Sequence, residues 1–285
     1  MNATLRTLSL LAIVFTLSGC GKEPTAPPVT TETPPALPPA SSMQVDFGFF
    51  DRNGAAQVVA EHPGGVEVQA DRSHWINAVV RVVFINLTVA DLLEEPWLAL
   101  HAALSQKATL GDDGWWTWVF AFRKDDHDVT LRLRARIDGG LVTWRMLVTD
   151  PSVGLANFPW FNGETQLAND SGFWLFHAPV GGEPVDVARI DWSNASLTQR
   201  QLSFRNVVEG SPEFGDQLEY RLEGAAASLT FHDASAATDA TIEWNETSGR
   251  GSIHVPDYNG GERGCWDEQL QNTVCEPSLV ATSRR

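Results

Sequence analysis

The sequence has 285 residues, of which 43% are hydrophobic, and its formal net charge at pH 7 is −16. This length and hydrophobic content are sufficient for a sizeable buried core. The acidic charge argues against nucleic acid and against an anionic membrane surface as partners, because both would repel the chain.

The first 19 residues have the composition of a signal peptide. Arg6 precedes an apolar run, Leu8 to Leu17, that is too short to span a bilayer as a permanent helix. Residues 17–20, Leu-Ser-Gly-Cys, resemble the lipobox of bacterial lipoproteins. The resemblance implies cleavage before Cys20 and acylation of its thiol and new amino terminus. We therefore expect a lipid-anchored protein of the cell envelope, at the outer membrane and facing the periplasm or the surface; the alternative is an ordinary secretory signal.

The composition divides the rest of the chain into three parts. Residues 20–43, with the lipidated cysteine, are rich in proline and predict an extended tether. Residues 44–276 contain no second linker of this kind and predict a single β-rich domain. Residues 277–285 predict a disordered tail. At the start of the domain, apolar residues alternate before a turn at Asp51–Gly54, which predicts a first strand through Val45, Phe47 and Phe49.

The range Asp71–Leu93 is the one long helical candidate. Its apolar residues recur at helical spacing, and Asp71 or Ser73 can cap the first turn. Many of these residues are β-branched, so a long buried strand is the alternative. Pro96 suits the first turn of a second, shorter helix that ends at Leu104.

Residues 115–149 predict three antiparallel strands joined by two turns. The pair Asp138-Gly139 suits a two-residue hairpin, because both central residues must accept positive φ. This turn places Leu133 opposite Trp144, and the preceding loop places Trp118 opposite Leu133. One face of the strands is then apolar, and the other carries Arg132, Arg134, Arg136 and Arg145.

The chain after residue 149 contains short segments of alternating hydrophobicity bounded by turn residues. They are 172–178, 185–192, 197–208, 217–222, 227–232, 241–244 and 250–255. No helix alternates with these strands, which argues against a parallel sheet. The expected fold is mainly β (α+β), an antiparallel meander of roughly ten strands forming a curved sheet or an open barrel, with one or two N-terminal helices packed on it.

Cys265 and Cys275 remain as a pair if Cys20 carries lipid. In an oxidising compartment such a pair predicts a disulfide, and closing this short loop is worth about 3 kcal/mol. The cysteines have no histidine or cysteine companions at zinc-ligand spacing. Residues 125–128, Asp-Asp-His-Asp, have the carboxylates of a hard-cation site, but aspartate is equally favoured in turns. We predict no metal and no other cofactor.

A pattern of tryptophans recurs in the second half of the chain. It comprises Gly-x-Trp-Leu at 172–175, Ile190-Asp191-Trp192, Ile242-Glu243-Trp244 and Cys265-Trp266-Asp267…Cys275. This pattern resembles a group of β-rich bacterial lipoproteins, over about the last two-thirds of the mature chain, and implies no catalytic residue. In architecture alone, the expected fold also resembles the half-barrel periplasmic carriers of lipids and lipoproteins.

The chain has no nucleophile elbow, zinc-protease helix motif, Walker loop or dinucleotide fingerprint. We therefore expect a non-enzymatic binding or envelope-structural role. The alternatives are a carrier of a lipid or other apolar ligand, a carbohydrate-binding surface module, and a hydrolase with unrecognised carboxylates.

Two features are candidates for ligand contact. The four arginines gather positive charge on one strand face, with Arg132 opposite Arg145 in the predicted register. Like charges in these positions destabilise a sheet, which suits a site for a carboxylate, a phosphate or an acidic partner. The excess of carboxylates favours the alternative, a solvated face with paired arginines. Trp115, opposite Arg136, predicts a cation–π contact. Trp160, in an aromatic loop at 157–163, is a candidate contact for a sugar or a lipid, or a cap on the sheet.

Overall fold

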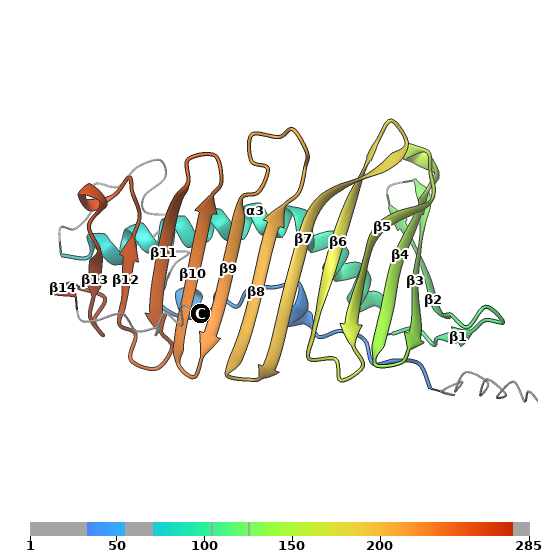
Figure 1. Ribbon diagram of the computed structural model, residues 1–285, viewed down its shortest axis with the longest axis horizontal. Coiled ribbons are helices and arrows are strands. Elements are labelled where there is room, and N and C mark those ends of the chain that lie inside the picture. The colour runs from blue at the N-terminus through green and yellow to red at the C-terminus, as the bar shows by residue number, and fades with distance from the viewer. Residues whose placement is uncertain (1–32, 55–70, 104, 125, 276–285) are drawn as a thin grey trace, which may run out of the picture. The chain divides into compact units, whose positions relative to one another are not determined.

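The computed structural model describes residues 33–54, 71–103, 105–124 and 126–275. Within these residues, 14 strands form one antiparallel sheet, and its order follows the sequence from β1 to β14 (Figure 1). The expected class, an antiparallel meander that does not close, is confirmed, although the expected number of strands was too low. The strands are β1 Thr109–Leu110, β2 Trp116–Lys124, β3 His127–Asp138, β4 Leu141–Asp150, β5 Leu155–Gln166, β6 Ser171–Val180, β7 Glu183–Ser196, β8 Gln199–Asn206, β9 Gln217–Glu223, β10 Ala226–Asp233, β11 Thr238–Asn245, β12 Gly251–His254, β13 Gly264–Trp266 and β14 Asn272–Thr273.

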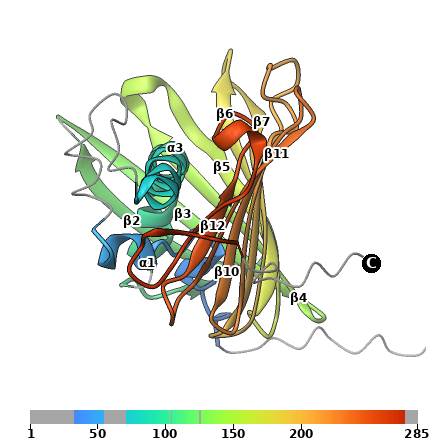
Figure 2. The ribbon, with the colours of Figure 1, turned by 90° about the vertical axis from the view of Figure 1, so that its left-hand side faces the viewer.

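One long helix, α3, spans Ser73–Ala103 and contains Pro96 in its interior. The helix predicted at Asp71–Leu93 is confirmed, and the alternative of a buried strand was wrong. The expectation of a separate second helix from Pro96 was also wrong, because the first helix continues through this proline to Ala103. The sheet curves around α3 (Figure 2), and the helix contacts β12 and β13 near its start and β2 near its end. Its N-terminal half is buried at helical spacing through Trp75, Ala78, Val79 and Val82. Among the described helices, none has the length and apolar character needed to cross a bilayer.

The start of α3 is capped by a residue from the opposite end of the chain. The side-chain oxygen of Asn272 accepts a hydrogen bond from the His74 backbone N–H at 3.0 Å, and its amide donates to Ser73 Oγ at 2.9 Å. The first N–H groups of a helix have no partner within the helix, so an outside acceptor stabilises them. The predicted disulfide between Cys265 and Cys275 is confirmed, and it encloses Asn272 in its loop.

The N-terminal residues are helical where a first strand was expected. A short 3-10 helix, η1, spans Ala40–Ser42, and α1 spans Gly48–Arg52. Phe49 and Phe50 are 2% and 1% exposed, and their rings lie 5.6 and 5.3 Å from that of Trp75. Consecutive residues of a strand point to opposite faces, so a helical turn is needed to direct both rings towards Trp75.

Part of the segment assigned to the tether packs against the sheet. The backbone carbonyl of Leu37 accepts a hydrogen bond from Asn169, and Ser42 is fully buried. Residues 1–32, which include the expected signal peptide and Cys20, lie outside the described part of the chain, as does the tail from residue 276.

The predicted register is confirmed between β2 and β3, where Trp118 lies opposite Leu133. Between β3 and β4 the predicted register was wrong by two residues, and Leu133 lies opposite Met146. The reason is the turn, which is formed by Gly139 and Gly140, while Asp138 pairs with Leu141. A shift of two preserves the inner and outer faces but changes the neighbours. Arg145 therefore lies opposite Arg134, not Arg132.

Tryptophans of the inner face lie over glycines of neighbouring strands. Gly163 is paired with Trp144 on one side and with Trp174 on the other, and Gly251 is paired in the same way with Trp244 and Trp266. An added Cβ at Gly163 would come within 2.6 Å of the Trp174 ring. A glycine within a strand commonly marks such a close approach, and here it makes room for the indole rings of the core.

Candidate ligand-binding pocket

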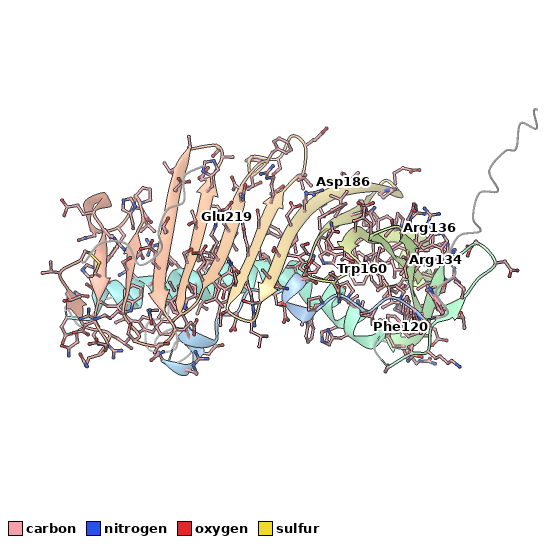
Figure 3. The ribbon with its side chains drawn as sticks, turned by 60° about the horizontal axis from the view of Figure 1, so that its bottom comes forward. Phe120, Arg134, Arg136, Trp160, Asp186 and Glu219 are labelled. Atoms are coloured by element: carbon pink, nitrogen blue, oxygen red, sulfur yellow. A yellow bond between two sulfur atoms is a disulfide. The ribbon has the colours of Figure 1, made fainter. Side chains whose placement is uncertain are left out.

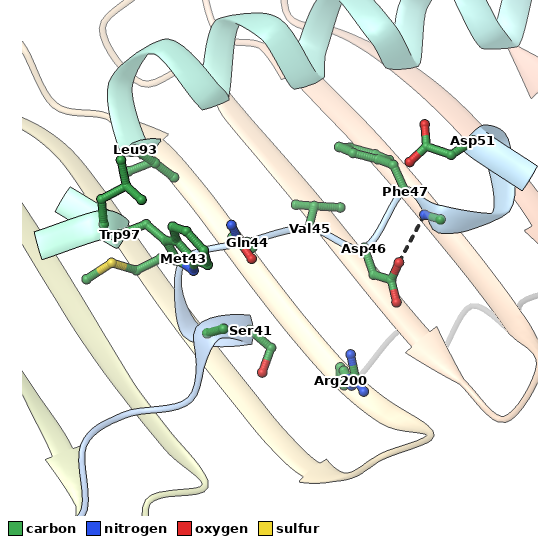
Figure 4. Close-up of a pocket in the computed structure, with 13 residues that line it drawn as sticks. Ser41, Met43, Gln44, Val45, Asp46, Phe47, Asp51, Leu93, Trp97 and Arg200 are labelled. Atoms are coloured by element: carbon green, nitrogen blue, oxygen red, sulfur yellow. Dashed lines mark hydrogen bonds between the residues drawn. The ribbon is translucent and has the colours of Figure 1, made fainter. Parts of the chain in front are cut away.

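A pocket of about 620 Å³ lies between residues 40–51, helix α3 and strand β8 (Figure 4). Small-molecule sites commonly measure about 300–1,000 Å³. Its described lining combines apolar side chains, Met43, Val45, Phe47, Leu93, Trp97 and Leu98, with polar ones, Ser41, Gln44, Asp46, Asp51 and Arg200. The pocket is therefore amphipathic.

Helix α3 supplies one apolar wall of this pocket. Leu93 is buried, whereas Leu98 is 51% exposed. Trp97 lies between them in sequence, and its ring centroid is 4.1 Å from that of His101. The Trp97 indole nitrogen is buried and makes no hydrogen bond in the described part of the chain.

Arg200 lies at the polar end of the pocket. Its guanidinium group forms no hydrogen bond or ion pair with any residue that the structure describes, and the side chain is half-buried. Asp46 is a second charged group of the lining, and its Oδ1 accepts a hydrogen bond from the Gly48 backbone N–H at 3.0 Å. Burial raises the pKa of Tyr220, which lies on β9 beneath them, and the Asp46 carboxylate adds to this effect. Tyr220 is therefore neutral, and Arg200 is the basic residue of the described pocket lining.

The wall formed by residues 40–47 is fixed to the sheet through side-chain hydrogen bonds. Trp174 Nε1 donates to Ser42 Oγ at 3.2 Å, and Asn194 Nδ2 donates to Ser41 Oγ at 3.0 Å. Because Trp174 lies on β6 and Asn194 on β7, the segment is held across two strands. The pocket thus has a fixed wall on this side.

The sequence interpretation did not identify this pocket. Residues 40–43 were assigned to the tether, and Val45 and Phe47 to a strand. The alternation of apolar Met43, Val45 and Phe47 directly after the prolines was a signal that this segment packs against something.

The four candidate arginines lie on the outer face of the sheet, the face directed away from α3. Arg134, Arg136 and Arg145 surround the ring of Trp115, with guanidinium carbons at 4.9, 5.1 and 4.9 Å from its centroid. The predicted contact of Trp115 with Arg136 is confirmed, and the structure adds two further arginines to it. Figure 3 shows Arg134 and Arg136 beside each other on this face. Arg132 lies apart and donates to Asn157 Oδ1 at 3.1 Å.

Trp160 lies in strand β5, where a loop was expected. Met146 pairs with Phe161 and Leu147 pairs with Pro159, so Trp160 is the extra residue of a bulge. Its side chain is half-buried and packs against the core, with its ring 6.1 Å from that of Phe161.

A serine, a histidine and an aspartate meet near the start of β5, but not in the arrangement of a hydrolase triad. His127 Nε2 lies 3.1 Å from Ser152 Oγ and 3.2 Å from Asp150 Oδ1. In a triad the carboxylate holds Nδ1 while Nε2 faces the nucleophile. Here Asp150 also accepts from the Ser152 N–H and caps the 3-10 helix η2, Pro151–Val153. The hydrogen bonds to Ser152 lower the pKa of Asp150, as is usual for a capping carboxylate.

The acidic hairpin tip is only partly described, because Asp125 lies outside the described residues. Within the described ranges, no three histidine, cysteine, aspartate or glutamate side chains converge as metal ligands.

No protein-family model, no curated protein and no solved structure matches this chain.

Proposed function

We propose that this protein is a lipid-anchored binding protein of the cell envelope that holds an amphipathic small molecule in the pocket beside helix α3. The observation that carries this proposal is the pocket of about 620 Å³, with an apolar wall on one side and Arg200 at its polar end.

The lining favours a ligand with an apolar chain and an anionic head group. Leu98 exposes half of its surface beside the pocket, and an apolar chain would cover it. Arg200 has no carboxylate partner in the described part of the chain, and a guanidinium group binds carboxylate and phosphate oxygens with directed hydrogen bonds. Asp46 and Asp51 can accept hydrogen bonds from hydroxyl or amino groups of the same head group.

The lipobox-like residues 17–20 support the lipid anchor and the envelope location. A curved open sheet with a helix on its concave side is also the architecture of half-barrel lipid carriers, and this analogy supports a carrier role. The alternatives have less support, because Trp160 packs against the core and the Ser152 cluster lacks the geometry of a triad.

The proposal can be tested with 11-(dansylamino)undecanoic acid, a fluorescent fatty acid, added to the purified full chain carrying Cys20→Ser. The dansyl emission should rise on binding, with saturation at one probe per chain. Leu98→Asp places a charge in the apolar wall and should weaken binding at least about tenfold, since a buried, unpaired charge is costly. Arg200→Gln should weaken it by a similar factor.

Leu167→Asp is the matched control for this experiment. Leu167 is 50% exposed, compared with 51% for Leu98, and it lies in the turn after β5 outside the pocket lining. This variant should bind the probe as the parent does. Equal affinities of the Leu98 and Leu167 variants would show that the probe does not occupy the pocket.

A further inference from the structure

The outer face of strands β2 to β4 concentrates positive charge around one tryptophan. Trp115 is only 6% exposed, yet it lies outside the core, because Arg134, Arg136 and Arg145 cover it. Each guanidinium carbon lies about 5 Å from the same ring centroid. No two of them are therefore farther apart than about 10 Å, close to the screening length of physiological salt, about 8 Å.

Among the residues that the structure describes, only one of these three arginines has an acidic partner. Arg134 forms an ion pair with Asp113, whose carboxylate also accepts a hydrogen bond from the Trp115 backbone N–H. Arg136 and Arg145 form no hydrogen bond or ion pair within the part of the chain that the structure describes. Both side chains are exposed, so the two unpaired guanidinium groups are accessible from solvent.

The neighbouring carboxylates do not neutralise this pair. Glu164 on β5 lies opposite Thr143, and Asp138 ends strand β3 two residues beyond Arg136. Neither forms an ion pair with an arginine within 4.0 Å in the described residues. The chain has 36 acidic and 20 basic residues, yet these two exposed arginines have no carboxylate partner among the described residues.

Placing Arg134 directly opposite Arg145 carries an energetic cost. Like charges on directly opposed strand residues destabilise a sheet, and the cation–π contacts with Trp115 act against this repulsion. A bound anion between the guanidinium groups would remove the repulsion.

We infer that Arg136, Arg145 and Arg134 form a binding site for a phosphate group on the outer face of the sheet, separate from the pocket beside α3. A phosphate fits this arrangement better than a carboxylate. Three guanidinium groups converge on one ring from different strand positions, and a tetrahedral dianion can accept hydrogen bonds from several of them at once. A planar carboxylate is satisfied by a single guanidinium fork.

The test is the melting temperature of the full chain in inorganic phosphate, compared with chloride at equal ionic strength. The melting temperature of the wild-type protein should be about 3 °C higher in phosphate than in chloride, at a phosphate concentration of roughly ten times the dissociation constant of the phosphate complex. The double variant Arg136→Gln, Arg145→Gln should lose this shift, while in chloride at low salt it should melt at the same or a higher temperature.

Arg189→Gln with Arg205→Gln is the control, because it removes two arginines of the same sheet face. Arg189 is paired with Asp191 and Arg205 with Gln217, and this control variant should keep the phosphate shift. An equal shift in both double variants, or no shift in the wild type and no binding to vesicles, would overturn the inference.

The source of the phosphate is distinguished by sedimentation with vesicles of phosphatidylcholine with and without phosphatidic acid, with every protein carrying Cys20→Ser so that the expected lipid anchor does not itself bind the vesicles. Retention on phosphatidic acid vesicles that disappears in the Arg136, Arg145 variant identifies a lipid head group. A phosphate shift without such retention identifies a soluble phosphate or phosphoester.

Discussion

Gly251 on β12 lies directly opposite Trp266 on β13, and the indole ring occupies the space where a Cβ atom would be attached. An ideal Cβ at Gly251 would lie 2.1 Å from Trp266 Cζ2 and 2.5 Å from the Glu243 carbonyl oxygen. The Glu243 oxygen belongs to the backbone, so movement of the Trp266 ring alone cannot relieve the clash with an added Cβ.

Gly251→Ala should therefore destabilise the fold by about 1–3 kcal/mol through overpacking. Urea denaturation followed by tryptophan fluorescence measures this change. Gly140→Ala is the matched control, since nothing lies within 4 Å of its Cβ position, and its effect should stay within about 0.5 kcal/mol. If the two alanine variants are equally stable, the ring does not pack on Gly251 as described.

The alternation of apolar residues predicted most of this sheet correctly. The seven segments predicted between residues 172 and 255 correspond to strands β6 to β12. Residues that favour turns, such as glycine, proline, asparagine and aspartate, separate these segments and made them recognisable. Strand β5 was missed, since Pro159 and the bulge at Trp160 interrupt the alternation. The continuity of α3 through Pro96 was also not predicted, because proline has no backbone N–H to donate within a helix. In the structure, burial of the helix on the sheet outweighs the loss of this one backbone hydrogen bond.

The candidate site was less predictable than the fold. The alternation of apolar and polar residues correctly predicted that the arginines share one face of the strands. It did not predict which arginines lie opposite each other on β3 and β4, because this register depends on whether Asp138 belongs to the turn. The pocket depends on contacts between residues 40–47 and strands more than 120 residues away, such as Ser42 with Trp174. No local pattern encodes such contacts.

Asn272→Ala tests the capping of α3 from the C-terminal loop. The variant removes the acceptor for the His74 N–H and the donor to Ser73 Oγ, and it should cost about 0.5–2 kcal/mol, the usual range for a lost helix cap. Gln271→Ala changes the neighbouring exposed side chain and should cost less than about 0.5 kcal/mol. Chemical denaturation of both variants measures the difference, and equal costs would contradict the capping role.

The stability of the fold should depend on the protonation of His74. Burial lowers the pKa of His74 below its ordinary value of 6.5, and its ring lies 2.8 Å from the Tyr258 hydroxyl oxygen. The neutral imidazole is therefore favoured in the folded state.

Since the pKa is depressed on folding, this contribution is fully present above pH 6.5 and is lost as the pH falls from 6.5 through the folded-state pKa. The free energy of unfolding of the wild type should fall more steeply in this window than that of His74→Gln, because the glutamine amide does not titrate. Parallel pH profiles of the two proteins would rule out a role for His74.

Solvent extraction and mass spectrometry can identify an amphipathic molecule bound in the pocket beside α3. The wild-type, Leu98→Asp, Arg200→Gln and Leu167→Asp proteins are purified in parallel from their membranes and extracted. We predict a stoichiometric amphiphile with an anionic head group from the wild-type and Leu167→Asp proteins, and its loss from the other two. Equal amounts from all four proteins, or no amphiphile from any of them, would contradict the binding of an amphiphile in this pocket.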